Sequence, residues 1–388
     1  MAYLLIKKHF DMAKYIYTNK RFAFVIMLLS ISAIVFWSGS RDPSLDEKAI
    51  MGGSATLEDP LSFEATLQAQ PGDEMLTRVL YSTINWVETN FEGMAFGLIV
   101  GACLLTLISM FPARGHGNGY INSLIGVFIG TPLGVCVNCS APVAKGMHDG
   151  GARLETTLAT MLSSPTLNVI VLSMLFSIFP LYIVMIKLVL TLVYIMLFVP
   201  WLSTWVFRKE RAQSYDDSRC QITPAPIGPD SECWSMAIAN ASRTLLGNLF
   251  YIGARTVPLM FVAGLLGAIV ANTLPLSALT DTEPNILSVA LIALVGILLP
   301  VPVAFDIVIV AVLISAGAPM VYSMTLLFTL GIFSVYPFFI IWNSISPKVA
   351  IILMLTLTIM GVIGGAVAEE IHKAELREML EYLDQEYN

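Results

Sequence analysis

The sequence predicts an all-α polytopic membrane protein, and three observations lead to this fold class. Hydrophobic residues make up 56% of the 388-residue chain and charged residues only 13%, whereas soluble globular chains are about 25% charged. Several apolar runs approach the ~20 residues that a transmembrane helix needs. Apolar segments are also interrupted at matching places in the two halves of the chain, a pattern typical of inverted-topology repeats. We expect about seven spans plus two re-entrant hairpins, or about nine spans, with broken helices in both repeats.

The first 38 residues are expected to form an uncleaved anchor helix. Five Lys and Arg residues and one Asp precede the apolar run 22–37, and "FWSGS" at its end is a poor signal-peptide cleavage site. Residues 39–90 are acidic, and the spacing of apolar residues near their end predicts an interfacial helix. The positive-inside rule then places the N-terminus in the cytoplasm and residues 39–90 outside. We expect the membrane to be a bacterial inner membrane.

Two predicted repeats, 91–207 and 251–368, make up most of the remaining chain. Each is expected to contain a span, a broken hairpin, a broken span and a span, with the first repeat starting outside and the second inside. "GARLETTLATMLSS" from Gly151 matches "GAPMVYSMTLLFTL" from Gly317, and "PVA" at Pro142 matches "PVA" at Pro302. A chance likeness between two apolar segments is the alternative. The other segments are a cytoplasmic loop with an amphipathic helix, 208–250, and an acidic C-terminal tail, 369–388.

The first break, "GVCVNCSAPVA" at 134–144, is the main candidate for chemistry. Its flanking charges are cytoplasmic on both sides, so the hairpin is expected to be re-entrant, with its non-helical backbone buried in protein or lining a cavity. Cys136 and Cys139 could hold a soft metal ion or form a redox dithiol; packing of small residues at a helix break is the alternative. The polar atoms of Asn138 and Ser140, and the backbone near Pro142, offer a site that needs no thiol.

The second break, "SSPTLN", combines a proline with polar side chains. Pro165 frees a backbone carbonyl within the membrane. Two interpretations stay open: these side chains form a substrate site, or they satisfy the kinked backbone. The polar residues concerned are Ser163, Ser164, Thr166 and Asn168, with Thr329 at the position of Ser163 in the second repeat.

Asp306 is the only charged residue between Glu283 and Lys348. An ionisable side chain inside a span costs at least about 2.5 kcal/mol on insertion scales and marks a functional site by default. We expect Asp306 to couple transport to protons or cations; capping of an unwound helix end is the alternative. Lys187 is expected instead to snorkel to the outer interface.

The sequence also limits cofactors and partners. It contains no Gly-x-x-x-x-Gly-Lys-Ser/Thr motif, so we expect coupling to an ion gradient unless a separate subunit supplies energy. We expect no cofactor and no nucleic acid; the partners are the lipid bilayer and a small-molecule or ion substrate, with a homodimer or partner subunits left open. Cys220 and Cys233 lack the spacing of a zinc site and are expected to be free thiols.

At the two breaks the chain resembles a known family. "GTPLGVCVNCSAPVAKGMHDGG" followed by "ATMLSSPTLNVIVL" is similar to the predicted-permease family that includes organoarsenical efflux permeases. The resemblance covers 91–368 and implies a polytopic permease, often one that exports soft metals or metalloids. It implies that the site residues are Cys136, Cys139, Pro142, Ser164 and Pro165.

The cysteine motif departs from the pattern of that family. The family usually has Cys-x-Cys-Gly with the proline four residues after the second cysteine. Here the cysteines are three residues apart and Pro142 follows Cys139 by three. This indicates a divergent branch, so an arsenical substrate is not carried over.

The expected function is an inner-membrane permease, not an enzyme, that exports a soft metal, metalloid or related small solute between two broken-helix repeats. One alternative is a membrane thiol oxidoreductase that uses Cys136 and Cys139. The other is a non-transporting membrane subunit of a larger complex. A second redox pair or quinone site would favour the first alternative, and partners that co-purify in stoichiometric amounts would favour the second.

Overall fold

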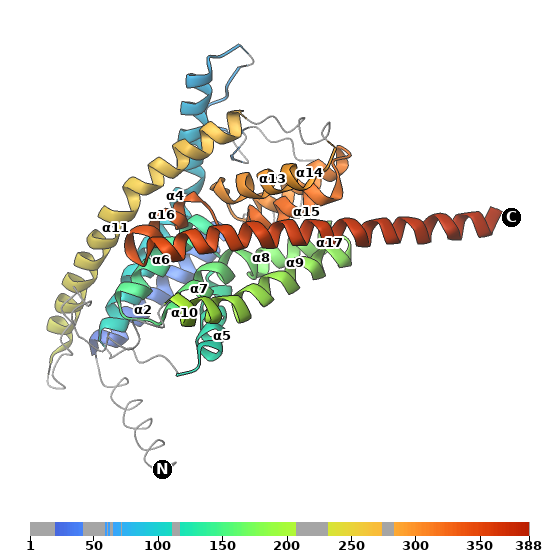
Figure 1. Cartoon of the computed structure of the whole chain (residues 1–388). Coiled ribbons are helices and arrows are strands. Elements are labelled where there is room, and N and C mark those ends of the chain that lie inside the picture. Colours follow the sequence, from blue (N-terminus) through green and yellow to red (C-terminus); the bar gives the residue numbers. More distant parts are fainter. Residues whose placement is uncertain are drawn as a thin grey trace, which may run out of the picture.

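The computed structural model describes residues 20–41, 59, 61–62, 65–70, 72–110, 117–206, 232–273 and 283–387, and every regular element within them is a helix. The basic residues before Lys20, residues 42–58 of the acidic segment and Cys220 lie outside the described residues. Figure 1 shows α11 along one side of the molecule, whereas α17 crosses the body and extends beyond it to the C-terminus.

Five helices in the described part of the chain are long and apolar enough to cross a membrane. They begin with α2 (Lys20–Phe36), which continues into the π-helix η1 (Trp37–Arg41), and α4 (Met75–Ser109). The third consists of α9 (Leu181–Val193), η3 (Tyr194–Phe198) and α10 (Val199–Val206); the others are α11 (Trp234–Thr273) and α17 (Pro347–Tyr387). α7 (Leu154–Thr166) and α8 (Val169–Ile178), bent by 42° at their junction, provide a sixth span if they are counted together.

Three of these helices are longer than the predicted elements. The expected interfacial helix and the span after residue 90 form one 35-residue helix, α4, because residues 75–92 contain neither Gly nor Pro to end it. The amphipathic helix before residue 250 is likewise continuous with α11, and the acidic tail continues α17. The predicted boundaries at 90/91, 250/251 and 368/369 therefore lie inside helices rather than between them.

Breaks occur near the predicted positions, although α6 begins at Val137, inside the break predicted over 134–144. The first hairpin consists of α5 (Gly119–Gly130), the 3-10 turn η2 (Thr131–Leu133) and α6 (Val137–Asp149). The second consists of α13 (Ile286–Leu298) and α14 (Phe305–Ser315). Gly134 precedes α6 with φ 60°, and Ala304 precedes α14 with φ 62°, so both second arms begin after a left-handed residue. Since a left-handed conformation is unfavourable for alanine, Ala304 is the strained member of the pair.

The two halves share a constant register. The same order recurs, from hairpin through broken helix to long helix, with α15 (Met320–Thr329) and α16 (Val335–Ser344) matching α7 and α8. Gly130 would clash with Ser163, and Gly296 with Thr329, if either glycine carried a Cβ atom. Asn168 caps α8 and Ser334 caps α16. Each of these three pairs is 166 residues apart: Gly130/Gly296, Ser163/Thr329 and Asn168/Ser334.

One predicted match does not hold in this register. Pro142 lies within α6, whereas Pro302 precedes the start of α14. The two "PVA" sequences are therefore not at equivalent positions, because they are 160 residues apart and the structural register is 166. The inverted orientation of the repeats in the membrane remains a prediction.

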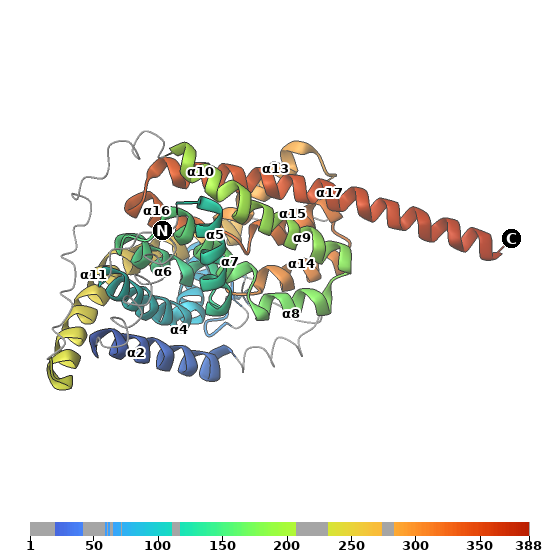
Figure 2. The ribbon, with the colours of Figure 1, turned by 90° about the horizontal axis from the view of Figure 1, so that it is seen from below.

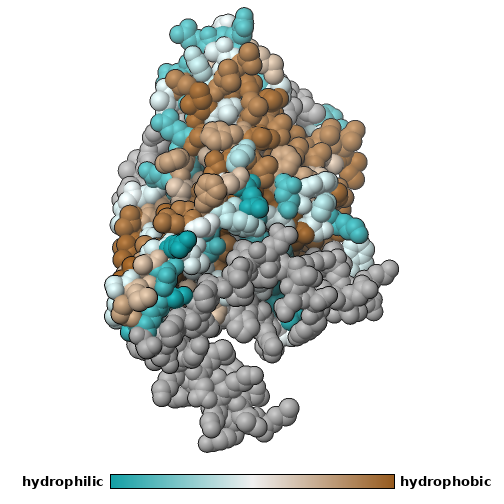
Figure 3. Space-filling view, turned by 90° about the vertical axis from the view of Figure 1, so that its left-hand side faces the viewer, coloured by the Kyte–Doolittle hydropathy of each residue, from teal (hydrophilic) through white to brown (hydrophobic). Residues whose placement is uncertain are grey.

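The main hydrophobic core surrounds the breaks. It includes side chains from α4, α6, α8, α14 and α16, while α2 packs outside α4 (Figure 2). The rings of Phe36 and Phe96 stack there with centroids 4.0 Å apart. The face in Figure 3 is largely apolar. α11 itself exposes Leu246, Phe250, Phe261 and Leu265, as expected for a helix that contacts lipid.

Candidate functional site

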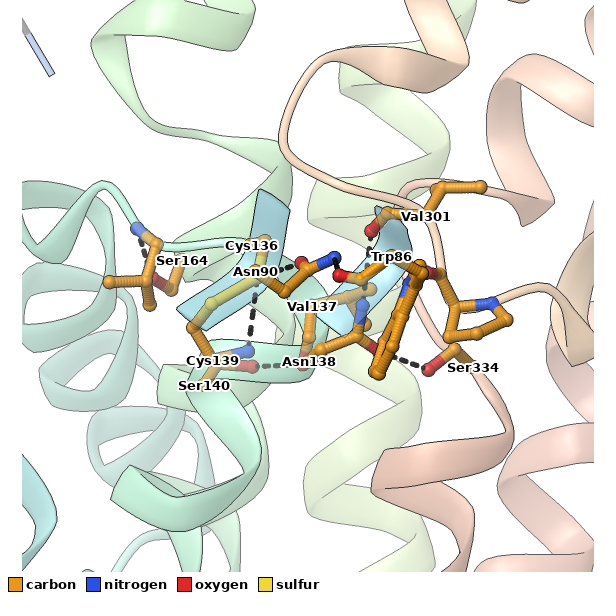
Figure 4. The surroundings of a disulfide bond; sticks show 12 residues. Trp86, Asn90, Cys136, Val137, Asn138, Cys139, Ser140, Ser164, Val301 and Ser334 are labelled. Atoms are coloured by element: carbon orange, nitrogen blue, oxygen red, sulfur yellow. Dashed lines mark hydrogen bonds between the residues drawn. A yellow bond between two sulfur atoms is a disulfide. The ribbon is translucent and has the colours of Figure 1, made fainter. Parts of the chain in front are cut away.

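Asn138 joins the two halves of the molecule at their breaks. It is the second residue of α6, and its side chain is fully buried. Its Nδ2 donates to the carbonyl of Val301 at 3.2 Å, and Ser334 Oγ donates to its Oδ1 at 2.8 Å (Figure 4). Val301 lies in the break of the second hairpin, and Ser334 lies in the break between α15 and α16. One amide therefore satisfies polar groups in both breaks of the opposite half.

Cys136 and Cys139 are joined by a disulfide in the first turn of α6. Both residues are buried, with exposed fractions of 2% and 1%. Cys136 is the N-cap of the helix, and its sulfur accepts from the backbone N–H of Cys139 at 3.1 Å. Asn90 Oδ1 on α4 lies 3.7 Å from the same sulfur (Figure 4). The two cysteines singled out from the sequence are therefore bonded to each other. They lie next to the hydrogen bonds from Asn138 to Val301 and Ser334, which we call the Asn138 bridge.

Residues 59–62 of the acidic segment and α4 cover this region from another side. Trp86 Nε1 donates to the carbonyl of Pro300, which precedes Val301 in the second hairpin. Leu61 is fully buried in the same core, and the backbone N–H of Leu61 donates to Asp59. Asp59 in turn accepts from Ser82 Oγ on α4 at 2.8 Å. Asp59, Leu61 and Ser62 of the acidic segment thus pack into the core, whereas residues 68–70 are exposed.

Asp306 forms a buried ion pair with Lys187. Lys187 Nζ on α9 lies 2.5 Å from Asp306 Oδ2, and the two side chains are 2% and 3% exposed. The prediction that Lys187 snorkels to the interface is therefore wrong. A buried carboxylate without a counter-charge is strongly unfavourable, so the two ions stabilise each other within the core.

Asp306 also approaches the same break as Asn138. It is the second residue of α14, as Asn138 is of α6. A Cβ atom on Gly331 would lie only 2.9 Å from the carboxyl carbon of Asp306. The second arms of both hairpins therefore place a polar side chain at residues 330–334, with Asn138 at Ser334 and Asp306 at Gly331.

The polar residues of the second predicted break mainly bond to their own helices. Thr166 Oγ1 donates to the carbonyl of Leu162 at 2.6 Å, and Asn168 Nδ2 donates to that of Ser164 at 2.7 Å. The hydroxyls of Ser163, Thr329 and Ser140 likewise donate to carbonyls three or four residues earlier. Satisfaction of the local backbone therefore accounts for these bonds. The exception is Ser164, whose hydroxyl accepts from the N–H of Val135 at 3.4 Å and so reaches the first hairpin.

The two prolines lie inside helices rather than at the breaks. Pro142 is in α6 and Pro165 in α7. The α7–α8 break follows Pro165 by two residues, at Leu167 and Asn168. The carbonyl of Pro142 lies against Gly101, where a Cβ atom would clash with it, so Gly101 allows α4 and α6 to approach closely.

No group of three or more His, Cys, Asp or Glu side chains could hold a metal ion within the described ranges. In the disulfide state neither sulfur of Cys136 or Cys139 is a thiolate, the form that binds metals. A metal bound there would need the reduced pair, with any further ligands coming from oxygen atoms or from the ligand itself.

Sequence reasoning missed Lys187, Trp86, Asn90 and Ser334. A signal for Lys187 was present, because it is the only charged residue between Glu155 and Arg208, just as Asp306 is alone in its own apolar stretch. Two isolated opposite charges in a membrane protein are expected to pair. Ser334 could have been found from the 166-residue register, which aligns it with Asn168. No comparable signal distinguished Trp86 or Asn90.

Comparison with known proteins identifies the family. A family model described as "predicted permease" matches residues 84–370. The chain is also similar to the UPF0718 protein YraQ of Escherichia coli (strain K12), with 26% identity over 282 residues that cover 72% of this chain and 77% of that protein. No solved structure matches the chain. Since the family model spans both hairpins and both broken helices, the chain belongs to the predicted permease family.

Proposed function

We propose that this permease is a secondary transporter of the bacterial inner membrane, with a cytoplasmic N-terminus, that exports a soft metal, metalloid or related small solute. The observation that carries the proposal is the Asn138 bridge. It links α6 to both breaks of the other half, through Val301 and Ser334, beside the cysteine pair. Discontinuous helices that meet between two repeats form the substrate sites of many secondary transporters.

The cysteine pair supports a soft substrate. Sulfur ligands favour soft ions, and reduction of the Cys136–Cys139 bond would place two of them at the junction. Both sulfurs are buried, so a solute that binds them must be small. The oxidised pair would then be a state that does not bind the substrate.

The Lys187–Asp306 pair supports coupling to protons or cations. It is a buried, oppositely charged pair between α9 and α14, and Asp306 touches the same break as Asn138. A proton or cation that binds Asp306 would weaken its attraction to Lys187 and change the packing between these two helices. Such a change would let an ion gradient alter the packing of α9 and α14 beside the proposed substrate site.

The disulfide favours one second candidate, a membrane thiol oxidoreductase. In that case Cys136 and Cys139 would exchange electrons with a partner dithiol or a quinone. Exposed fractions of 2% and 1% weigh against this alternative, because thiol–disulfide exchange requires the attacking sulfur to reach the disulfide. The membrane-subunit alternative gains no support from a particular contact in the described residues.

The test is binding of a trivalent arsenical, phenylarsine oxide, to the purified full-length protein in detergent. Unfolding temperature is measured after reduction with a phosphine, in a Cys220→Ser/Cys233→Ser background. We expect stabilisation of the reduced protein, loss of that stabilisation in Cys139→Ser, and retention in Cys103→Ser. Cys103 is the matched control because it is also buried but belongs to a different cluster, with α2 and α11.

The outcomes separate the candidates. Arsenical binding accompanied by uptake into inside-out vesicles supports export of a soft solute. Stabilisation that persists in Cys139→Ser contradicts the role of the thiols. Electron transfer to a quinone or partner dithiol, abolished by either cysteine change and without solute uptake, would favour the oxidoreductase.

A further inference from the structure

A cavity lies between the two halves, away from the Asn138 bridge. It has a volume of about 550 Å³ and is lined by α6, α11 and α16. Its polar wall consists of Lys145, Asp149, Tyr251, Arg255, Asn343 and Ser344. This volume is within the range of about 300–1,000 Å³ that is usual for small-ligand sites. In the predicted topology this end of α6 faces the cytoplasm, with Lys145 and Asp149 about 9 and 15 Å along the helix from Cys139.

Lys145 supplies a buried cation whose charge is already balanced. Its side chain is 3% exposed, and Nζ lies 2.8 Å from Asp149 Oδ2. The same ammonium donates to Ser344 Oγ at 3.0 Å and lies 5.2 Å from the centre of the Tyr251 ring. These contacts fix Lys145 and Ser344 at the wall, so α6 of the first half and α16 of the second share this part of the cavity.

Arg255 supplies a second cation, and its charge is not balanced by an ion pair among the described residues. Its guanidinium lies 3.9 Å from the centre of the Tyr251 ring, and Nη1 donates to the carbonyl of Tyr251 at 3.3 Å. Stacking on the ring holds the guanidinium plane and leaves its remaining N–H groups available. Because the charges of Lys145 and Asp149 cancel, Arg255 leaves the cavity with one net positive charge.

We propose that this cavity binds the oxyanion group of a small anionic ligand, of the phosphate or carboxylate type. Arg255 binds two ligand oxygens through its planar fork, which matches phosphate and carboxylate geometry. The Ser344 hydroxyl lines the same cavity and adds a donor, while the charge of Lys145 stays balanced by Asp149. The group can belong to a free solute or to a lipid headgroup. The site goes beyond the proposed export of a soft solute and does not depend on it.

The test measures anion binding to the full-length protein in a neutral detergent. Thermal unfolding is followed as inorganic phosphate is titrated, with sodium chloride at equal ionic strength as the reference. We expect saturable stabilisation by phosphate above that of chloride, with affinity weakened about tenfold or more in Arg255→Gln because a charge-assisted bidentate contact is lost. Arg255→Lys should be intermediate, since it keeps the charge but not the fork.

Arg243→Gln is the matched control. Arg243 is exposed on the same helix, α11, twelve residues earlier, and does not line the cavity. Its replacement should leave the phosphate affinity unchanged. Because Arg255 is exposed and outside the ion pairs of the described residues, Arg255→Gln should fold, and its unfolding temperature without phosphate checks this.

A lipid arm distinguishes the two sources of the oxyanion. Nanodiscs of phosphatidylcholine alone are compared with nanodiscs that contain phosphatidylglycerol, and bound lipid is counted by native mass spectrometry. Retention of phosphatidylglycerol that depends on Arg255 supports the site with a headgroup as ligand, whereas phosphate binding in neutral detergent supports a free solute. The proposal is overturned if neither anion acts beyond chloride, or if Arg255→Gln and Arg243→Gln have equal effects. Failure of arsenical export would leave these binding results unaffected.

Discussion

Lys187 Nζ on α9 and Asp306 Oδ2 on α14 are 2.5 Å apart, and both side chains are almost fully buried. Removal of one partner leaves the other as an unpaired charge in the core. We therefore expect Asp306→Asn and Lys187→Met each to lower the free energy of unfolding by about 3–5 kcal/mol. The double variant Lys187→Met/Asp306→Leu should recover most of this loss, because apolar side chains can replace a buried pair. Chemical unfolding in detergent measures all three.

Lys373→Ala is the control for this ion pair. Lys373 is 53% exposed beside Glu369, so its loss should leave the free energy of unfolding nearly unchanged, because solvent screens an exposed pair. If the pair couples transport to an ion gradient, the double variant will be stable but inactive in vesicles. Active transport by a stable double variant would show that the pair is only structural.

Asn138 and Ser334 should be energetically coupled. Asn138→Leu leaves the Val301 carbonyl and the Ser334 hydroxyl without this partner, and a lost buried hydrogen bond costs about 1–3 kcal/mol. Ser334→Ala also removes the cap on Tyr336, but that loss is the same in both backgrounds. A double-mutant cycle should therefore give a coupling of about 0.5–3 kcal/mol. Additive effects within 0.3 kcal/mol or so would argue against the bridge, and Ser177→Ala, at an exposed hydroxyl, should be neutral.

The glycines of the two hairpins should respond differently to a methyl group. In Gly296→Ala the new Cβ meets the Thr329 hydroxyl, so Thr329→Ala should restore part of the lost stability. In Gly130→Ala the new Cβ meets both Ser163 and the backbone carbonyl of Thr160, so Ser163→Ala should restore little. Each single change should cost about 1–3 kcal/mol.

Gly253→Ala is the control for the glycine changes. A Cβ there would meet no other atom within 4 Å, and alanine is the better helix former by roughly 0.5–1 kcal/mol. The variant should therefore be as stable as the wild type or more stable. Denaturant midpoints of the five variants rank their stabilities. Equal rescue by Ser163→Ala and Thr329→Ala would contradict the different contacts of Gly130 and Gly296.

The ion pair between Arg21 on α2 and Glu232, which lies just before α11, should be lost in acid. Arg21 donates to both carboxylate oxygens of Glu232, and this contact holds the pKa of Glu232 below its ordinary value. A lowered carboxyl pKa stabilises the folded state above the pKa of the unfolded chain, and the contribution disappears as pH falls through the folded pKa. The unfolding temperatures of wild type and Glu232→Gln should therefore differ above about pH 5 and converge only as the pH falls below the ordinary Glu pKa of about 4.3 and through the lower folded value.

Cys233 should report the side of the membrane on which α11 begins. Its thiol is exposed, and a contact with Ser235 and the N–H of Met236 lowers its pKa, which favours the reactive thiolate. In a Cys220→Ser background, a membrane-impermeant maleimide should label Cys233 in inside-out vesicles and not in intact cells. Buried Cys103 should stay unlabelled in both. Labelling in intact cells would reverse the predicted orientation.

Composition and local pattern predicted the helical membrane fold and the positions of the breaks, because Gly, Pro and hydroxyl residues act on the backbone nearby. Helix lengths were predicted less well: α4 and α11 continue through polar stretches that contain no helix-breaking turn. The partners at the site depend on contacts between residues far apart in sequence. Asn138 was identified as polar at a break, but its bonds to Val301 and Ser334 span more than 160 residues. Lys187 differs from Asn138, because its isolation in an apolar stretch was a signal for pairing with Asp306, although its position also fits snorkelling.

The cross-connection made by Asn138 has a consequence for fragments of this chain. A fragment that ends within 207–231 would carry Asn138 without either of its partners, and the complementary fragment would carry Val301 and Ser334 without the amide. The Lys187–Asp306 pair would be divided by the same cut. Each fragment would thus present unmatched polar groups that the other neutralises, so the two pieces should be degraded when made separately and should accumulate when co-expressed. Stability in this permease is then a property of complementation between its halves, and neither half is an autonomous folding unit.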